Sequence, residues 1–181
     1  MRARHTTRCS AGQSWDWDGV HFAVLRPAAA DYERTLKANA MSCVLRVSSA
    51  PDGAQGARSV LLTGDIEREQ ELALLADDAS ALRSDVLIVP HHGSKTSSTP
   101  AFLDAVQPRV AVFQAGYRNR FGHPAPEVLQ RYVERGIEID ATPSCGAWRW
   151  DAAASAPGPT TGICQRDAAR RYWHHGDGYH R

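Results

Sequence analysis

Two adjacent histidines follow a short apolar run in the segment SDVLIVPHHGSKTSSTP, which extends from Ser84 to Pro100. A neutral imidazole is the commonest ligand for zinc in proteins, and it also suits manganese and iron. Gly93, directly after His91 and His92, permits close approach of a backbone or a ligand. For a single histidine, a hydrogen-bonded loop residue would be the simpler interpretation. The pair, in this setting, favours a site for a metal ion or an anion.

Hydroxyl groups around one lysine continue the same segment, at Ser94, Lys95, Thr96, Ser97 and Ser98. Hydroxyls and an ammonium group are donors that hold a phosphate. The same residue types are also common in caps and turns, here leading into a helix that would begin with Pro100. Phosphate binding and turn formation both remain open interpretations of this run.

An aspartate follows a second apolar run, in LLTGDIE. The Asp65 carboxylate is suited to coordinate a cation, and Gly64 would let the backbone turn sharply enough to present it. The alternative is that Asp65 caps the helix that follows.

A third polar segment, GYRNRFGHPAPE, follows a third apolar run. Arg118, Asn119, Arg120 and His123 are donors, and Phe121 is an aromatic side chain that could stack on a base or a sugar. A histidine just before a helix lies near its positive end, a setting suited to an anion. The alternative is a helix-entry loop with solvated arginines.

The elements that must position these residues are short apolar strands alternating with helices. The pattern predicts strands over residues 21–27, 42–47, 59–63, 86–89 and 109–116, with short strands in IEID and AWRW. It predicts helices over residues 66–82, 100–106 and 125–136, and a loop with one helical turn between the first two strands. This alternation indicates an α/β fold. Because the carboxyl ends of parallel strands meet at one edge of a sheet, Asp65, the histidine pair and His123 are expected to converge there.

Composition limits the classes of protein to consider. A chain of 181 residues, 43% hydrophobic and 23% charged, is long enough for one substantial core and too short for two ordinary domains. Lys and Arg total 21 against 20 Asp and Glu, so the chain lacks the large positive net charge that would by itself indicate nucleic-acid binding. The basic start lacks the apolar core of a signal peptide, and no apolar run has membrane length.

The four cysteines, Cys9, Cys43, Cys145 and Cys164, lie far apart without CxxC spacing, which argues against a structural zinc site. Free thiols are the simplest interpretation, and a disulfide between Cys145 and Cys164 in an oxidising compartment is the alternative.

In order, LLTGDIE, SDVLIVPHHGSKTSS and GYRNRFGHP resemble the C-terminal metallo-β-lactamase-fold domain of the ComEC-type DNA-internalisation competence proteins. The resemblance extends through CSAGQSWDWDGVHFAVLRP, NAMSCVLRV and CQRDAARRYWHH, and so covers most of the chain. It implies the C-terminal portion of an αββα sandwich, with residues 1–150 as a partial domain. Residues 151–181 would form a linker and a terminal element packing on that domain.

The resemblance also implies roles for single residues. Asp65 matches the family's metal-bridging aspartate, and His91 is assigned to the metal, Zn or Mn, with His92 facing the substrate. His92 and Lys95 are the predicted catalytic residues. Asn119 and His123 match the family's last motif, near the phosphate, and with Ser94 and Thr96 they are the predicted substrate-binding residues.

One departure from the family pattern bears on activity. The fold's main ligand cluster, an HxHxDH or HxDxDH segment, should precede the strand with Trp15 and Trp17, and only His5 stands there. The family's membrane region, which would attach the domain to the inner membrane on the periplasmic side, is absent as well. A tight catalytic zinc site normally has three protein ligands. We therefore expect a truncated or split domain that is weak or inactive alone.

For the complete family domain, the resemblance implies hydrolysis of DNA phosphodiesters with two divalent ions. Two alternatives remain: a phosphoester hydrolase for small molecules such as phosphorylcholine, and a non-enzymatic module that binds DNA or a partner. The second would use the arginines at positions 118, 120, 131, 135, 166, 170, 171 and 181. In the tail, Tyr172 and Trp173 are expected to pack on the sheet while His174, His175 and His180 face solvent.

Overall fold

The computed structural model describes residues 7–49, 58–151 and 162–171. They form a seven-stranded sheet whose strand order follows the sequence, β1 to β7, and a two-stranded sheet of β8 and β9. The strands of the large sheet are β1 (Ser14–Trp17), β2 (Val20–Arg26), β3 (Val44–Ser49), β4 (Ser59–Leu62), β5 (Val86–Ile88), β6 (Val110–Phe113) and β7 (Glu138–Ala141). The fold is therefore α/β, as predicted.

The direction of strand pairing in the large sheet changes at β4. Strands β1 to β4 pair antiparallel, whereas β4 to β7 pair parallel. The parallel strands are joined by the helices α1 (Arg68–Asp78), α2 (Pro100–Val106) and α3 (Pro126–Val133), as parallel connections require. Three parallel strands thus end at one edge of the sheet, each followed by one of the polar segments.

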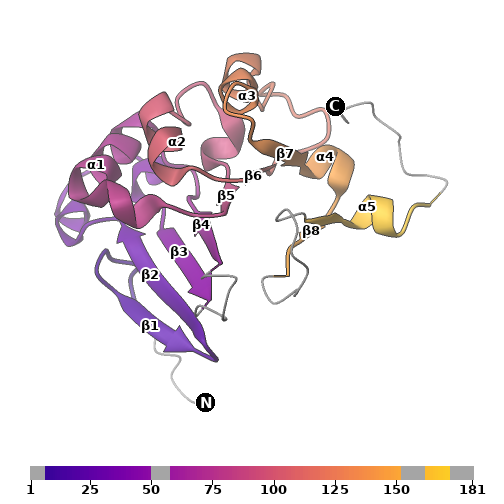
Figure 1. The fold of residues 1–181 in the computed structure, drawn as a ribbon. Helices are drawn as coiled ribbons and strands as arrows, with labels where there is room; N and C mark the ends of the chain where they lie inside the picture. Colours follow the sequence, from indigo (N-terminus) through magenta and orange to yellow (C-terminus); the bar gives the residue numbers. More distant parts are fainter. Residues whose placement is uncertain (1–6, 50–57, 152–161, 172–181) are drawn as a thin grey trace, which may run out of the picture.

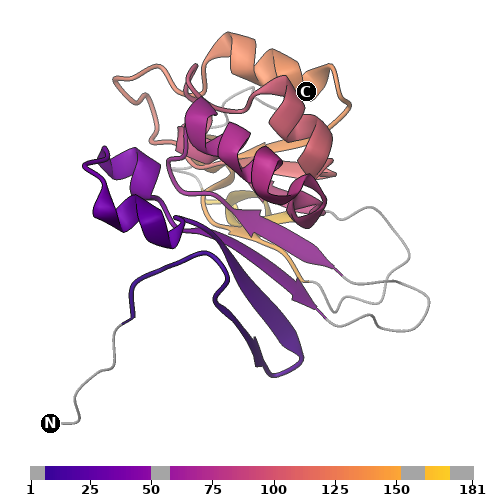
Figure 2. The ribbon, with the colours of Figure 1, turned by 90° about the vertical axis from the view of Figure 1, so that its left-hand side faces the viewer.

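One face of the sheet packs against the helices (Figure 1). Leu61, Leu87, Ala111 and Phe113 contribute this face to a buried core that also contains Leu74 of α1 and Phe102 of α2. Figure 2 looks onto this side and shows that the helices lie over the parallel strands, while the β1–β2 hairpin extends beyond them. The core is thus centred beneath the parallel half, which carries the predicted site.

The opposite face of the sheet is apolar too. The pairing register places one row across it: Trp15, Phe22, Val47, Val60, Val86 and Val110. Trp148 and Trp150 cover the end of this row at Val86 and Val110. Trp148 belongs to β8 (Trp148–Arg149), which pairs with β9 (Ile163–Cys164). At the other end Trp15 is 45% exposed, so this face is covered less completely by the described residues than the helical face is.

The segment between β2 and β3 contains two short 3-10 helices, η1 (Ala29–Glu33) and η2 (Ala38–Met41). The sequence predicted a loop with one helical turn here. Helix α1 is shorter than predicted, because a second short helix, η4 (Ala79–Leu82), follows it. Its separate start is capped by the Asp78 side chain, which accepts from Ser80 N and Ala81 N.

All four cysteines are paired, so the interpretation as free thiols is wrong. The Cys145–Cys164 disulfide was one of the two possibilities, and it joins α4 (Thr142–Cys145) to the start of α5 (Gln165–Ala168). The Cys9–Cys43 disulfide was not anticipated; it fixes the segment before β1 to the start of β3. Both bridges connect the ends of the described chain to the body of the fold.

A buried glutamate holds the hydroxyl-rich segment in place. Glu71 of α1 is fully buried, and its carboxylate accepts hydrogen bonds from the backbone of Ser98 and, at 2.8 Å, of Thr99. From α3, Arg131 donates to the carbonyls of Ser97 and Ser98, each at 3.0 Å. Burial raises the Glu71 pKa above its ordinary value, although the hydrogen bonds from Thr99 and Ser98 and the charge of Arg131 oppose the shift.

No helix among the described residues is both long enough and apolar enough to cross a membrane. Residues 152–161 of the linker predicted over residues 151–162 lie outside the described residues, as do the tail residues Tyr172, Trp173, His174, His175 and His180.

We expect Glu71→Ala to lower the free energy of unfolding by about 3 kcal/mol, because two buried backbone N–H groups would lose their acceptor. Urea unfolding measures the change. Glu69→Ala removes an exposed carboxylate from the same helical turn and is the matched control. An equal effect of the two substitutions would contradict the anchoring role.

The raised pKa of Glu71 sets the direction in which the stability of the protein should change with pH. Between the ordinary pKa of 4.5 and the raised folded value, the native state keeps a proton that the unfolded chain releases. The contribution of Glu71 to stability therefore falls as the pH rises through that window. Urea unfolding from pH 4 to pH 8 should show wild type losing stability relative to Glu71→Gln; a constant difference would count against the shift.

Candidate functional site

The loops after β4, β5 and β6 meet at the edge of the sheet, as the parallel-strand argument predicted. The amide of His91 donates to the Gly64 carbonyl at 3.0 Å, which joins the second loop to the first. His92 Nδ1 lies 2.6 Å from the Gln114 carbonyl, and the Ala125 amide donates to the Gly93 carbonyl at 2.9 Å. The second and third loops are therefore joined twice.

The histidine pair lies on an uncommon stretch of backbone. His91 has φ 49° and ψ 39°, and His92 has φ 57° and ψ 18°, so both are left-handed, and Gly93 follows at φ 80°. Each non-glycine residue in this region costs about 1–2 kcal/mol, and such strain persists only where the surroundings fix it. A Cβ on Gly93 would lie 2.8 Å from both Phe113 Cε1 and Pro124 Cβ. Only glycine therefore fits the third position.

His92 forms a pair with Asp65. Its Nε2 lies 3.4 Å from Asp65 Oδ1, and both side chains are nearly half exposed. The Gln114 carbonyl can only accept, so His92 Nδ1 must carry the proton. In a neutral ring Nε2 then has a lone pair, which faces the carboxylate oxygen. Asp65 is not a helix cap, because the residue at the N-cap of α1 is Glu67.

His91 belongs to a different polar cluster. Its Nδ1 lies 3.3 Å from both Glu67 Oε1 and Thr96 Oγ1, and its Nε2 lies 3.5 Å from Asn39 Nδ2. The sequence assigned Asp65 and His91 to the metal, but the imidazole beside Asp65 is that of His92. The metal-ligand assignment itself stays a prediction. Glu67 was missed, although it stands two residues after Asp65 in the LLTGDIE segment.

The hydroxyl-rich segment divides into two parts. Ser97, Ser98 and Thr99 are structural: Ser97 Oγ donates to the Pro90 carbonyl at 2.9 Å, Ser98 bonds to Tyr132, and Thr99 caps α2. The two predicted binding hydroxyls, of Ser94 and Thr96, lie 3.2 Å apart beside His91. The turn interpretation therefore holds for the second half of the segment, and phosphate binding by the first half stays a prediction.

The predicted catalytic lysine lies at the surface. The Lys95 side chain is 72% exposed, and its Nζ lies 3.5 Å from Glu127 Oε1 at the start of α3. A groove of about 520 Å³ adjoins this position, between η2 and the first turn of α1. Asn39, Glu67 and Thr96 line the groove and also contact His91, so the groove opens beside the histidine cluster.

Asn119 and His123 hold the third loop closed. The Asn119 side chain donates from Nδ2 to the His123 carbonyl at 2.6 Å and accepts at Oδ1 from the His123 amide at 3.0 Å. Both polar ends of Asn119 are thus used within the loop. The His123 ring lies 6.0 Å from the His91 ring, centroid to centroid. Partial burial lowers the His123 pKa, as do the nearby charges of His91 and His92, so this imidazole is neutral at pH 7.

At least three of the arginines proposed for DNA contact have structural partners. Arg131 donates to the Ser97 and Ser98 carbonyls, and Arg135 pairs with Asp104 at 2.8 Å. Arg166 donates to the Pro143 carbonyl. Arg118 and Arg120 remain in the third loop, over the rings of Tyr117 and Phe121. Arg181 lies outside the described residues.

A second group of potential ligands occurs away from the three loops. Ligand atoms of Asp140, Cys145 and Cys164 lie within 4.8 Å of one another. The two sulfurs are bonded to each other, and Asp140 accepts from Trp148 Nε1 at 2.6 Å. This group serves the packing of β8 and β9 and is not a metal site in this state.

Comparison with known proteins finds no matching family model. The chain is 40% identical over 145 residues to competence protein ComA of Neisseria gonorrhoeae, which is 80% of this chain and 19% of that protein. It is 39% identical over 145 residues to recombination protein 2 of Haemophilus influenzae, 80% of this chain and 17% of that protein. It is 35% identical over 127 residues to ComE operon protein 3 of Bacillus subtilis, 70% of this chain and 15% of that protein. The chain spans less than a fifth of the length of these relatives.

Two glycines provide a matched test of the histidine turn. Gly93→Ala should lower the free energy of unfolding by about 3 kcal/mol, because the new Cβ would strain a left-handed backbone and crowd Phe113 and Pro124. Gly122 also has a positive φ but nothing within 4 Å of an added Cβ. Gly122→Ala should therefore cost only about 1 kcal/mol. Chemical unfolding of both variants checks the difference; equal losses would show that crowding at Gly93 is unimportant.

Proposed function

We propose that the chain is a metal-dependent phosphodiesterase module. The premise is that it belongs to the family of competence proteins, with which it aligns over four fifths of its length, and so serves DNA uptake. The relatives from Neisseria gonorrhoeae and Haemophilus influenzae are named as a competence protein and a recombination protein. The module would act on the DNA that such a system handles, at the edge where the three polar loops meet.

The contact between His92 and Asp65 carries the proposal. With the Nδ1 proton donated to the Gln114 carbonyl, Nε2 and the Asp65 oxygen are two acceptors 3.4 Å apart. A cation bound by both atoms would turn this repulsive pair into a favourable one, as would a second proton on the ring. A backbone carbonyl on the far nitrogen is the usual partner that orients a metal-ligating histidine.

The residues fit part of a zinc or manganese site. Bonds of about 2.0–2.2 Å in a tetrahedral site place neighbouring ligand atoms about 3.4 Å apart, which matches the Nε2 to Oδ1 distance. Asp65 and His92 would hold the ion, which exchanges the roles first expected of His91 and His92. Two ligands are fewer than the three of an ordinary catalytic zinc, so binding by this chain should be weak.

A bound divalent ion would lower the pKa of a water molecule that it binds and would neutralise negative charge on a phosphodiester. The other residues would position the phosphate. His123, neutral at pH 7, is a candidate to exchange a proton with a phosphate oxygen, and the hydroxyls of Ser94 and Thr96 are candidate donors to it. Lys95, exposed and flexible, would add a cation at the rim.

The metallo-β-lactamase-like sandwich is proposed on the second face of the sheet. Phe22, Val47 and Val60 belong to an apolar row, and among the described residues Trp148 and Trp150 cover this row at one end. An αββα sandwich would place a second sheet there. In a longer polypeptide of the relatives' kind, that layer would also bring the remaining metal ligands to Asp65 and His92.

Metal binding tests the proposal independently of activity. Isothermal titration of the chain with Zn²⁺ and with Mn²⁺ should show a site whose affinity falls at least 10-fold in His92→Ala and in Asp65→Ala. The matched control is His21→Ala, because His21 and Asp16 form another exposed pair, with 2.9 Å between Nδ1 and Oδ1. Unchanged affinity in His92→Ala would overturn the assignment.

Substrate comparison separates the remaining alternatives. Single-stranded DNA, double-stranded DNA and phosphorylcholine should be assayed with metal, each with wild type and Asp65→Ala. Asp65-dependent cleavage of DNA supports the proposed module, and cleavage of phosphorylcholine alone favours a small-molecule hydrolase. Metal-independent DNA binding that weakens steeply with salt, without cleavage, favours a binding module.

A further inference from the structure

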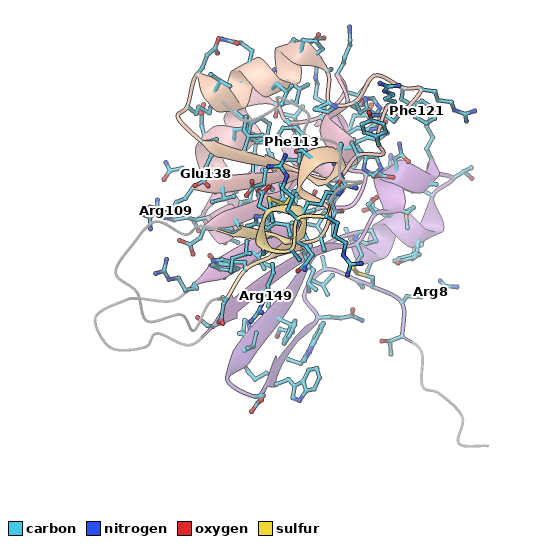
Figure 3. The ribbon with its side chains drawn as sticks, turned by 90° about the vertical axis from the view of Figure 1, so that its right-hand side faces the viewer. Arg8, Arg109, Phe113, Phe121, Glu138 and Arg149 are labelled. Atoms are coloured by element: carbon cyan, nitrogen blue, oxygen red, sulfur yellow. A yellow bond between two sulfur atoms is a disulfide. The ribbon has the colours of Figure 1, made fainter. Side chains whose placement is uncertain are left out.

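The third loop exposes aromatic rings beside the proposed phosphate site. Phe121 is 67% exposed and Tyr117 is 44% exposed, both between β6 and α3. Figure 3 shows Phe121 at the margin of the molecule, apart from Phe113 within its body. An exposed large aromatic side chain adjoining a polar site is informative, because it forgoes the burial that usually stabilises it.

The rings form a series that leads from solvent into the site. Phe121 lies nearly parallel to His123, with 16° between planes and 5.9 Å between centroids. The His123 ring lies 6.0 Å from that of His91, and His91 lies 6.3 Å from His92. A nucleotide whose phosphate reached the histidines would therefore have its base near Phe121.

Positive charge accompanies both aromatic side chains. The Arg118 guanidinium lies 5.2 Å from the Tyr117 ring centroid, and that of Arg120 lies 4.9 Å from the Phe121 ring centroid. Aromatic side chains for stacking together with cations for the backbone are the combination by which proteins hold single-stranded nucleic acid. A hydrophobic protein partner would not require the two arginines.

The loop is held in shape before any ligand binds. The Asn119 side chain bonds to both the amide and the carbonyl of His123, and the Gly122 amide donates to the Asn119 carbonyl at 3.3 Å. A ring on such a loop loses little freedom on binding, so more of the stacking energy contributes to affinity.

We propose that the loop over residues 116–123 is a stacking platform for single-stranded DNA, with Phe121 as the main contact to a base. The inference rests on the proposed function for the identity of the polymer. Bases in a duplex are already stacked on one another, so the platform would favour unpaired nucleotides. Phe121 is a substrate-positioning residue in this proposal, and Asn119 maintains its loop.

Binding without metal tests the platform separately from the catalytic proposal. Fluorescence anisotropy with a labelled oligothymidylate, in EDTA and low salt, should show affinity falling about 5- to 100-fold in Phe121→Ala. Phe121→Trp should retain wild-type affinity or exceed it. Trp17→Ala is the matched control, because Trp17 is 72% exposed but flanked by Asp16 and Asp18, and it should change nothing.

An abasic oligonucleotide of the same length distinguishes stacking from charge. Phe121→Ala should leave its binding unchanged, since it has phosphates but no bases to stack. An equal loss for the abasic probe, no loss for oligothymidylate, or no binding by wild type would overturn the platform. Loss of oligothymidylate binding in Phe121→Ala, with metal affinity indifferent to His92→Ala, would support the platform and reject the metal site.

Discussion

The arrangement of the site depends on the left-handed turn at His91, His92 and Gly93. Two consecutive non-glycine residues are held in a costly conformation, and backbone bonds to the first loop at Gly64 and to the third loop at Ala125 hold them there. The turn directs the two imidazoles to different partners, His92 to Asp65 and His91 to Glu67. Without it, adjacent histidines at a strand end would not serve two clusters.

A second constraint operates behind the turn. Glu71, Arg131 and Tyr132 come from two helices and bond to the short segment over residues 97–99. Burying a carboxylate is costly, and the raised Glu71 pKa reflects that cost. Its two backbone hydrogen bonds offset part of the cost and fix the segment after the histidines. The hydroxyls closest to the helices are structural, whereas those of Ser94 and Thr96 stay beside His91.

The sequence predicted the elements best where local signals agreed. Helix α2 has the predicted bounds because Thr99 caps it and Pro100 suits its first turn. The convergence of three loops followed from the parallel strands. The sequence did not show which of His91 and His92 lies beside Asp65, because two consecutive non-glycine residues give no signal for a left-handed backbone. Likewise, the Cys9–Cys43 pairing depends on how the segment before β1 lies against β3. The Asn119 contacts depend on how its loop closes.

The order of strands has a consequence for how this unit joins anything larger. All seven strands of the large sheet are neighbours in sequence order, and every internal strand has partners on both sides. Another segment could not enter between two of them without replacing an existing ladder. Growth of the sheet is limited to its edges, β1 and β7, and further packing must take place on its faces. The unit is therefore modular: a larger protein can extend or cover it without interrupting the hydrogen bonds that bring its three loops together.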